Sequence, residues 1–431
     1  MRKIKIGVFG AGRGRVMIDT VAGYPDAELV AICDKYEYLL DRCAEMAEEK
    51  GLNVTMYTDF DKFIEHDMDA VILANYAHEH APYAIRCLKK GMHVASEVQP
   101  AVSLGQAVEL VEAVEESGKL YCYLENYCYF RATTEMRKLY REGKLGEFVH
   151  GEGEYVHDCE NIWRDITYGE KNHWRNCFNS TFYNTHSFGP IVHITGLRPV
   201  RVIGIETKPT ERMQKLGYRA AEGAMEIVQM ENGGMFKSLH GYMKREPAAI
   251  WYSIYGKDAM AESDRWDENL YTVHVYDDRE SNQHTTYVPE PVVKTDLAEH
   301  TLGHGGSDFY PIHYFVEAIL GKKDGLDNII DVYSAVDMAI PGILAYKSIC
   351  NNNQPYDVPN FRIKEERDKY RNDFWCTWGE GEFHAPITGH GDYEIPDEVY
   401  DKVREDWLKA QEWQKQEDEK ERREKEKAMG R

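Results

Sequence analysis

The sequence lacks an apolar run of the roughly 20 residues that a membrane-spanning helix needs, so we expect no membrane partner. Its nine cysteines are scattered and never form a Cys-x-x-Cys pair, which disfavours a disulfide framework and a zinc site. Basic residues are outnumbered: 52 Lys and Arg against 74 Asp and Glu give a formal net charge of −22. We therefore expect no nucleic acid partner, because nucleic acids carry phosphate charge. The first residues lead into a strand-like stretch instead of an apolar leader, so we expect a cytoplasmic protein.

What the sequence does have is alternating strand and helix signals over its first 125 residues. The strand-like stretches are Ile4–Phe9, Ala27–Asp34, Asp69–Ala74, Gly91–Glu97 and Leu120–Glu125. Helix-forming stretches separate them, an order typical of βαβ units in a doubly wound parallel sheet. We predict an α/β domain of Rossmann type over residues 1–125, and the total of 431 residues leaves room for a second or third domain.

After residue 125 the signals change to one strand after another. The strand-like stretches are Phe148–Val156, Val200–Lys208, Ala224–Met230, Met235–Met243, Ile250–Tyr255 and Leu270–Tyr276. Asn232-Gly233-Gly234 is typical of a hairpin turn, and helices are expected at Tyr310–Leu320 and Val332–Cys350. We predict an α+β domain over residues 126–375, with an open, mainly antiparallel sheet and helices on one face.

The last predicted unit, residues 376–431, is a charged, largely helical extension. Val399, Val403 and Trp407 follow at four-residue intervals, which predicts a helix with one face on the body of the protein. Beyond Trp413 the chain is almost wholly Glu, Asp, Lys, Arg and Gln. We interpret that stretch as a solvated tail rather than a partner-binding element.

A glycine-rich turn follows the first strand. Gly10 permits the tight turn, and Gly12 lets the backbone approach a pyrophosphate at the start of the next helix. Gly14 falls one place before the third position of the G-x-G-x-x-G fingerprint, which is Arg15 here. Asp34 stands 22 residues after Gly12, where an acid accepts hydrogen bonds from ribose hydroxyls and repels a 2′-phosphate. The predicted cofactor is therefore NAD rather than NADP.

Further polar residues are expected at the cofactor site. Either Arg13 or Arg15 could clamp the pyrophosphate. The nicotinamide half is expected to be lined by Asn75, His80, Glu97 and Asn126. His78 and His80 follow the third strand, on the side where a doubly wound sheet binds ligands. They could form a zinc pair but lack a third ligand nearby, and His78 can equally be an ordinary surface histidine.

Several of these stretches resemble the cofactor domain of the Gfo/Idh/MocA oxidoreductases. The motifs are Asn75-Tyr76-Ala77-His78-Glu79-His80, Gly91-Met92-His93-Val94 and Glu97-Val98-Gln99-Pro100. Most members of that family carry Glu-Lys-Pro where this chain has Glu97-Val98-Gln99. The resemblance implies that this chain lacks the lysine that assists removal of the hydroxyl proton in ordinary sugar and inositol dehydrogenases.

A narrower resemblance, to the NAD-dependent glycosidase branch, accounts for the missing lysine, because the α-N-acetylgalactosaminidases of that branch also carry Glu-Val. The similar motifs are Leu124-Glu125-Asn126-Tyr127-Cys128-Tyr129, Tyr155-Val156-His157-Asp158, Tyr183-Asn184-Thr185-His186-Ser187-Phe188-Gly189-Pro190, Gly303-His304-Gly305-Gly306-Ser307-Asp308, Asp331-Val332-Tyr333 and Val358-Pro359-Asn360-Phe361. They run in order and end near residue 365, so the extension is not covered. The resemblance also implies a homo-oligomer built through the open sheet.

Candidate catalytic residues lie in these motifs. Oxidation of a sugar carbinol needs a base within hydrogen-bond reach of the hydroxyl proton. Tyr183 and His186, just before a Gly-Pro turn, could present a phenol and an imidazole to one substrate. Glu125 could hold sugar hydroxyls or act as a second base, and His157 with Asp158 offers another acid/base pair. Tyr183 and His186 could instead be buried for packing, Glu125 could be a carboxylate at the domain interface, and His157-Asp158 could be a strand-end pair. His157, Asp158 and His186 could together bind a divalent metal.

The residues expected to bind substrate are Tyr129, Trp163, Arg164 and His304. Trp163 could stack on a sugar ring and Arg164 could pair with an anion. His304 could instead cap a helix.

These features predict NAD-dependent oxidation of a hydroxyl, at C3, of a small-molecule sugar or glycoside. In a second interpretation the C3 ketone acidifies the C2 proton, the aglycone is eliminated, water adds and the ketone is reduced again, so that the net reaction is glycoside hydrolysis. The two differ in whether the cofactor stays bound through the cycle. A third interpretation is a sugar- or NAD-binding protein without catalysis.

Overall fold

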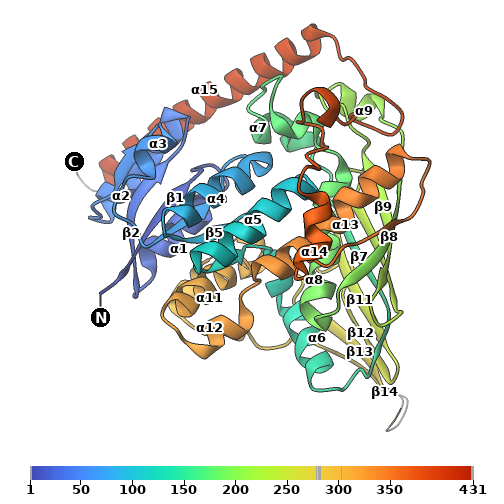
Figure 1. Cartoon of the computed structure of the whole chain (residues 1–431). Helices are drawn as coiled ribbons and strands as arrows, with labels where there is room; N and C mark the ends of the chain where they lie inside the picture. Colours follow the sequence, from blue (N-terminus) through green and yellow to red (C-terminus); the bar gives the residue numbers. More distant parts are fainter. Residues whose placement is uncertain (1, 278, 280–282, 302, 429–431) are drawn as a thin grey trace.

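The computed structural model describes residues 2–277, 279, 283–301 and 303–428. It contains a six-stranded sheet and a nine-stranded sheet, and a long C-terminal helix runs across the molecule from the second part to the first (Figure 1).

The six-stranded sheet is parallel, in the order β3-β2-β1-β4-β5-β6. Its strands are β1 (Ile4–Phe9), β2 (Ala27–Cys33), β3 (Thr55–Tyr57), β4 (Ala70–Leu73), β5 (His93–Ser96) and β6 (Tyr121–Tyr123). The helices between them are α1 (Arg15–Gly23), α2 (Glu37–Glu49), α3 (Phe60–Phe63), α4 (His80–Lys89) and α5 (Leu104–Ser117). All four residues of β4 are buried, as a strand covered by helices on both faces requires. The predicted Rossmann fold is confirmed.

The nine-stranded sheet has the order β14-β13-β12-β11-β7-β10-β9-β8-β15. Its strands are β7 (Phe148–Val156), β8 (Pro199–Glu206), β9 (Gly223–Met230), β10 (Met235–Gly241), β11 (Ala249–Gly256), β12 (Ala259–Ser263), β13 (Val273–Asp277), β14 (Gln283–Tyr287) and β15 (Tyr356–Asp357). The ladders of the described residues are antiparallel except the one between β7 and β10. The predicted open, mainly antiparallel sheet is therefore confirmed, and β12, β14 and β15 lengthen it beyond the expected strands.

Helices cover one face of the large sheet (Figure 1). The helices of this part are α6 (Arg131–Arg141), α7 (Trp163–Ile166), α8 (Asn184–Thr195), α9 (Glu211–Gln214), α10 (Asp296–His300), α11 (Phe309–Ile319), α12 (Lys323–Asn328), α13 (Val332–Cys350) and α14 (Lys364–Arg367). Helix α8 packs on β7 and β10, and α13 packs on β8. The stretch Lys323–Cys350 is apolar enough to cross a membrane by composition, yet 78% of its most apolar window is buried within the protein, as in a core helix.

Helix α11 ties the two parts together. Its residues Phe309, Ile312, Phe315 and Val316 are buried in the same hydrophobic cluster as the β1 side chains of the Rossmann sheet. Asp308, directly before α11, is thereby placed beside the glycine turn.

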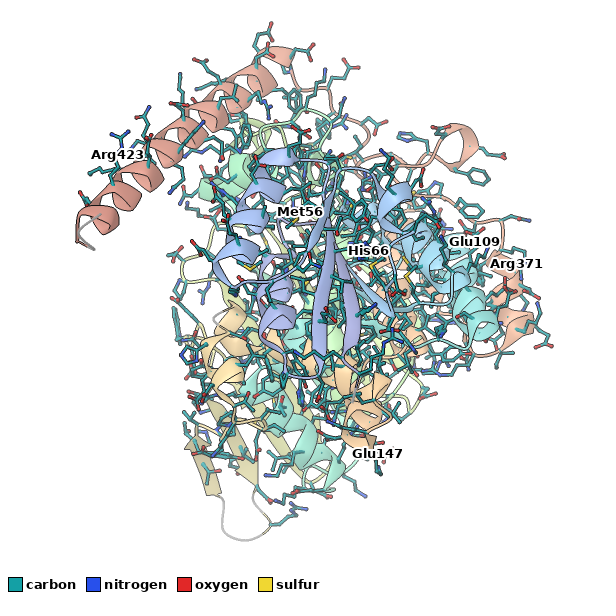
Figure 2. All side chains as sticks on the ribbon, turned by 90° about the vertical axis from the view of Figure 1, so that its left-hand side faces the viewer. Met56, His66, Glu109, Glu147, Arg371 and Arg423 are labelled. Carbon is teal, nitrogen blue, oxygen red and sulfur yellow. The ribbon has the colours of Figure 1, made fainter. Side chains whose placement is uncertain are left out.

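The C-terminal helix α15 (Asp397–Ala428) lies on the body only over its first turns. Tyr400, Val403 and Trp407 are buried at helical spacing, whereas Val399 is only half-buried. The inward face therefore contains Val403 and Trp407, as predicted, and Tyr400 takes the place of Val399. Figure 2 shows the distal part of α15, where Arg423 lies, projecting away from the body. Residues 429–431 of the predicted extension lie outside the described residues.

Candidate active site

A groove at the carboxyl ends of the Rossmann strands, here called the cofactor groove, is lined by Gly10, Gly12, Arg13, Asp34, Asn75 and neighbouring residues. Gly10 has a φ of +101°, and a Cβ there would lie 2.3 Å from the backbone of Ala74. A Cβ at Gly14 would lie 2.0 Å from the carbonyl oxygen of Gly10. Gly14 is thus required inside the turn itself, which explains why the third glycine comes one place early.

The groove fits the predicted dinucleotide. Asp34 directly follows β2, and its carboxylate accepts hydrogen bonds from the backbone N–H groups of Ala11 at 2.7 Å and Tyr36 at 2.9 Å. Burial raises the pKa of Asp34, and these hydrogen bonds oppose the shift. The buried Oδ1 of Asn75 has no hydrogen-bond partner among the described residues. This oxygen is therefore open to a hydrogen-bond donor from a bound ligand or from water.

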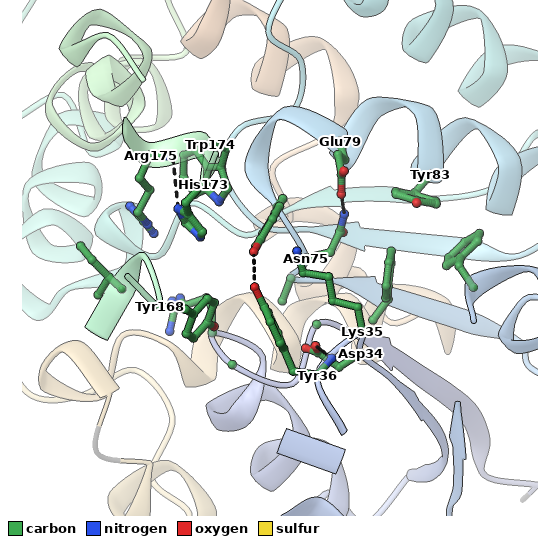
Figure 3. Close-up of a pocket in the computed structure, with 18 of the residues that line it drawn as sticks. Asp34, Lys35, Tyr36, Asn75, Glu79, Tyr83, Tyr168, His173, Trp174 and Arg175 are labelled. Atoms are coloured by element: carbon green, nitrogen blue, oxygen red, sulfur yellow. Dashed lines mark hydrogen bonds between the residues drawn. The ribbon is translucent and has the colours of Figure 1, made fainter. Parts of the chain in front are cut away.

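Residues of the second part form the facing wall of the cofactor groove. Figure 3 shows Tyr168, His173, Trp174 and Arg175 on one side of the groove and Asp34, Lys35 and Tyr36 on the other. We call residues 166–175 the cover segment. Its contribution to a nucleotide site could not be inferred from motif spacing, because it is more than 100 residues from the Rossmann residues it faces.

The structure separates the two arginines predicted to clamp a pyrophosphate. Arg15 begins α1 and pairs with Asp19 at 3.1 Å near the surface, so its predicted role does not fit. Arg13 lines the groove but is engaged by Glu97 at 2.8 Å and Asp308 at 2.9 Å. Arg13 thus links the glycine turn to the second part.

Asp308 collects hydrogen bonds from several predicted site residues. Besides Arg13, the Asn126 side-chain amide donates to it at 2.8 Å, and His304 Nδ1 lies 2.8 Å from its carboxylate. Burial alone would raise the pKa of Asp308, but His304 and Arg13 hold the pKa well below its usual range. The carboxylate therefore stays ionised and fixes His304.

A second space, here called the substrate cavity, continues from the groove. The two share the lining residues Arg13, Ala74, Asn75, Ile166, Trp174 and Arg175. The predicted residues His80, Glu97, Asn126, His157, Tyr183, His186 and His304 also line the substrate cavity. His80 is nevertheless held on both ring nitrogens, by the carbonyl oxygens of Gln99 at 3.0 Å and Asn75 at 3.2 Å.

His186 is oriented from behind by Glu125. Its Nδ1 lies 2.8 Å from Glu125 Oε1, and the Glu125 side chain is fully buried. A carboxylate there fixes the proton on Nδ1, so that Nε2 is left as the acceptor facing the cavity. Glu125 does not line the cavity, so its predicted direct contact with sugar hydroxyls does not fit, and its place is that of a partner to His186.

The local fold that holds His186 differs from the expected one. Gly189-Pro190 does not form a turn but lies inside α8. Because Pro190 has no N–H, the carbonyl of His186 is left without its helical partner. The hydroxyl of Tyr252, on β11, donates a hydrogen bond to that carbonyl.

Tyr183 stands next to His186 with its own charged partner. The two rings are stacked, with centroids 5.4 Å apart and an angle of 19° between planes. Arg175, which is half-buried, donates a hydrogen bond to the Tyr183 hydroxyl. This contact fixes the orientation of the phenol.

Tyr155 and Tyr127 belong to the same aromatic group but were not predicted. The Tyr155 ring lies 4.7 Å from that of His186, and its hydroxyl is 3.3 Å from His157 Nδ1. Burial, and then the neighbouring His304 and His186, lower the pKa of His157. The sequence could have indicated Tyr155, because it stands two residues before His157 at the end of a strand. Residues at that spacing point to the same face of the sheet.

Several predicted residues lie away from both spaces. Asp158 pairs with Arg212 at 2.9 Å and Lys244 at 3.0 Å, so it joins neither a catalytic pair nor a metal site with His157 and His186. Trp163 is fully buried, with its indole N–H donated to Asn176, and is a core residue. Arg164 lies beside Asp165 near the surface.

Two more predicted residues are occupied elsewhere. The Tyr129 hydroxyl donates to the carbonyl of Asn328 at 2.7 Å, and its ring lines neither space. His78 stacks on Trp378 with ring centroids 5.2 Å apart. The predicted roles of Asp158, Trp163, Arg164 and Tyr129 at the substrate do not fit this placement.

Comparisons with known proteins agree with this architecture. Residues 4–125 match the oxidoreductase family with an NAD-binding Rossmann fold, Gfo/Idh/MocA. Residues 203–368 match the C-terminal domain of glycosyl hydrolase family 109. Both matches end before α15.

Curated relatives carry the same names at low identity. A glycosyl hydrolase family 109 protein from Stenotrophomonas maltophilia is 25% identical, and the alignment covers 84% of this chain and 89% of the relative. An alpha-N-acetylgalactosaminidase from Shewanella oneidensis is 23% identical, with 84% and 85% covered.

Solved structures share the fold. The scyllo-inositol dehydrogenase from Lactobacillus casei with bound NAD(H) has a TM-score of 0.63 at 18% identity, with 83% of this chain and 99% of that chain covered. Levoglucosan dehydrogenase in complex with NADH and L-sorbose has a TM-score of 0.65 at 16% identity, with 84% and 100% covered. Residues 4–125 are therefore similar to the NAD-binding Rossmann domain of the Gfo/Idh/MocA oxidoreductases and residues 203–368 to the C-terminal domain of glycosyl hydrolase family 109, and the resemblance seen in the motifs is confirmed.

Proposed function

We propose that the protein hydrolyses glycosides by a redox cycle: oxidation at C3, elimination of the aglycone, addition of water and reduction of the ketone. The observation that carries the proposal is the presence of two separately oriented proton acceptors in one cavity. His186 is backed by Glu125, and Tyr183 is backed by Arg175. A plain dehydrogenase needs one base, whereas the cycle must also remove the C2 proton.

The residues divide the work as follows. Gly10, Gly12 and Asp34 would hold the dinucleotide backbone and ribose, and Asn75 its nicotinamide half. NAD, when bound there, supplies a hydride acceptor for the first step and a hydride donor for the last. Of His186 Nε2 and Tyr183 Oη, one takes the proton of the C3 hydroxyl.

The other acceptor takes the C2 proton, which the adjacent ketone makes acidic. Breaking the C1–O bond then releases the aglycone and leaves a C1–C2 double bond conjugated with the ketone. Water adds at C1, a proton returns to C2, and reduction of the ketone restores the sugar. The net change is one hydrolysed glycosidic bond with no net redox change.

The test uses purified protein without added cofactor and a panel of p-nitrophenyl glycosides, including the N-acetyl-α-galactosaminide because one relative bears that name. Nitrophenol release without a rise in absorbance at 340 nm, together with deuterium at C2 of the sugar formed in D2O, supports the cycle. Oxidation of free sugars that requires added NAD and yields NADH, without nitrophenol release, identifies a plain sugar dehydrogenase and overturns the proposal.

A further inference from the structure

The cover segment contacts the Rossmann wall of the cofactor groove. The Tyr168 ring lies 4.7 Å from the ring of Tyr36, whose hydroxyl donates to Glu170 at 2.7 Å. The Tyr168 hydroxyl also lies over Gly12, 2.7 Å from where a Cβ would stand. The glycine turn and residues of the cover segment therefore line the same groove, and both would contact a dinucleotide bound there.

The cover segment does not hold this shape by itself. Tyr168 has a φ of +53° and Gly169 a φ of +58°. A left-handed conformation is unfavourable for a residue other than glycine, so Tyr168 needs support from its surroundings.

Helix α15 supplies the support. Arg404 donates a hydrogen bond to the carbonyl of Tyr168. Its Cα lies 2.7 Å from where a Cβ on Gly169 would stand, so the helix and the turn are in direct backbone contact. The guanidinium of Arg404 in turn lies 4.4 Å from the ring centroid of Trp407.

Trp407 joins both parts of the molecule at this point. Its buried indole meets Tyr168 edge-on, with centroids 6.2 Å apart, and Tyr38 of α2 in the same way at 6.4 Å. Tyr400 anchors the start of the helix, since its hydroxyl donates to the carbonyl of Gly217 at 3.1 Å. One helix thus spans from the second part to the Rossmann domain over the cover segment.

We infer that α15 is a built-in part of the cofactor site: Arg404 and Trp407 are positioning residues that hold the cover segment closed, so that NAD(H) stays bound from one turnover to the next. The inference rests on the proposed function, because a redox cycle must keep the reduced cofactor for its last step. Both family matches end at or before residue 368, so this device is an addition to the matched domains.

The test measures release of NADH from the full-length holoenzyme in the absence of any sugar, by loss of its fluorescence after mixing with excess NAD. The variants are Trp407→Ala and Arg404→Ala, and Trp413→Ala is the matched control because that indole, on the same helix, is 61% exposed. We expect NADH release at least 10-fold faster in both variants and unchanged release in the control. Trp407→Phe should restore slow release in part.

A second readout separates positioning from general damage. In Arg404→Ala turnover should come to depend on added NAD, with a rise in the KM for NAD that exceeds any fall in kcat, while the melting temperature stays close to that of the unmodified protein. Unchanged NADH release in folded Arg404→Ala and Trp407→Ala proteins overturns the inference, and if Trp407→Ala fails to fold, Arg404→Ala alone decides. Because no sugar is present, the result is independent of whether the glycosidase cycle is correct.

Discussion

At the scale of single residues, the site depends on the side chains that orient its two candidate bases. Glu125 fixes the tautomer of His186, and Arg175 orients the hydroxyl of Tyr183. The backbone carbonyl of His186 also depends on another side chain. Pro190 has no N–H to donate to this carbonyl, and the Tyr252 hydroxyl donates a hydrogen bond to it instead.

Replacing Glu125 with Gln should therefore lower kcat by about 10²- to 10⁴-fold, because an amide no longer fixes the proton on His186 Nδ1 or stabilises the imidazolium. KM and cofactor retention should change little, since Glu125 does not line the cavity. Steady-state kinetics check this, with the exposed Glu109→Gln as control. A Glu125→Gln protein with unchanged kcat would show that His186 is not a catalytic base.

Removing the Tyr252 hydroxyl with Tyr252→Phe should leave a buried carbonyl unsatisfied and lower the free energy of unfolding by about 1–3 kcal/mol. Urea unfolding measures this free energy. Tyr255→Phe, on the same strand but 37% exposed, should lower the free energy of unfolding much less. Equal losses in the two proteins would contradict the role given to Tyr252.

At the scale of elements, the parallel fold and five of the six described Rossmann strands followed from apolar runs alternating with helices, whereas the three-residue edge strand β3 was not predicted. The interpretation was wrong at Gly189-Pro190, because a turn dipeptide can lie inside a helix when tertiary contacts satisfy the freed carbonyl. Asp158 and Trp163 were misplaced for a related reason. Their partners, Arg212 and Asn176, are defined only by the tertiary fold.

The cover segment should respond to pH through His173. Its Nδ1 accepts the backbone N–H of Arg175 at 3.3 Å, which requires a neutral ring. Burial, then the charges of Arg175, Lys35 and the nearby His78, lower the pKa of His173 from 6.5 to about 2. Because the pKa of His173 is lowered in the folded protein, the stability that the neutral ring contributes is complete above pH 6.5. It is lost as pH falls toward 2, by about 1.4 kcal/mol per pH unit.

NADH release from the holoenzyme should therefore be faster at pH 5.5 than at pH 7.5. His173→Asn keeps an acceptor for Arg175 that does not titrate, so the pH dependence should become weaker. His66→Asn, remote from the groove, should behave like the unmodified protein. An identical pH profile in His173→Asn would assign the effect to another group.

At the scale of the whole molecule, the described helices leave the face of the large sheet opposite α8 and α13 uncovered (Figure 1). Apolar side chains stand exposed there on adjacent strands, namely Ile205 at 57%, Met225 at 37% and Ile227 at 41%. An apolar sheet face of this kind favours association with a second copy.

We therefore expect the protein to sediment as an oligomer and Ile227→Asp to shift it toward the monomer. Ile162→Asp, equally exposed at 41% but on another part of the surface, should leave the sedimentation coefficient unchanged. A monomeric unmodified protein at micromolar concentration would contradict the expectation.

Helix α15 lies on the body over its first turns only, and this affects how the protein withstands proteolysis. The contacts of α15 with the cover segment and its surroundings described above lie between Asp397 and Trp407, whereas the lysine- and arginine-rich distal turns project into solvent (Figure 2). Trypsin should therefore trim the distal turns without effect, but a cut ahead of Tyr400 would also remove Arg404 and Trp407. The ratio of bound nucleotide to protein in a preparation would then report how much of the C-terminus has survived proteolysis.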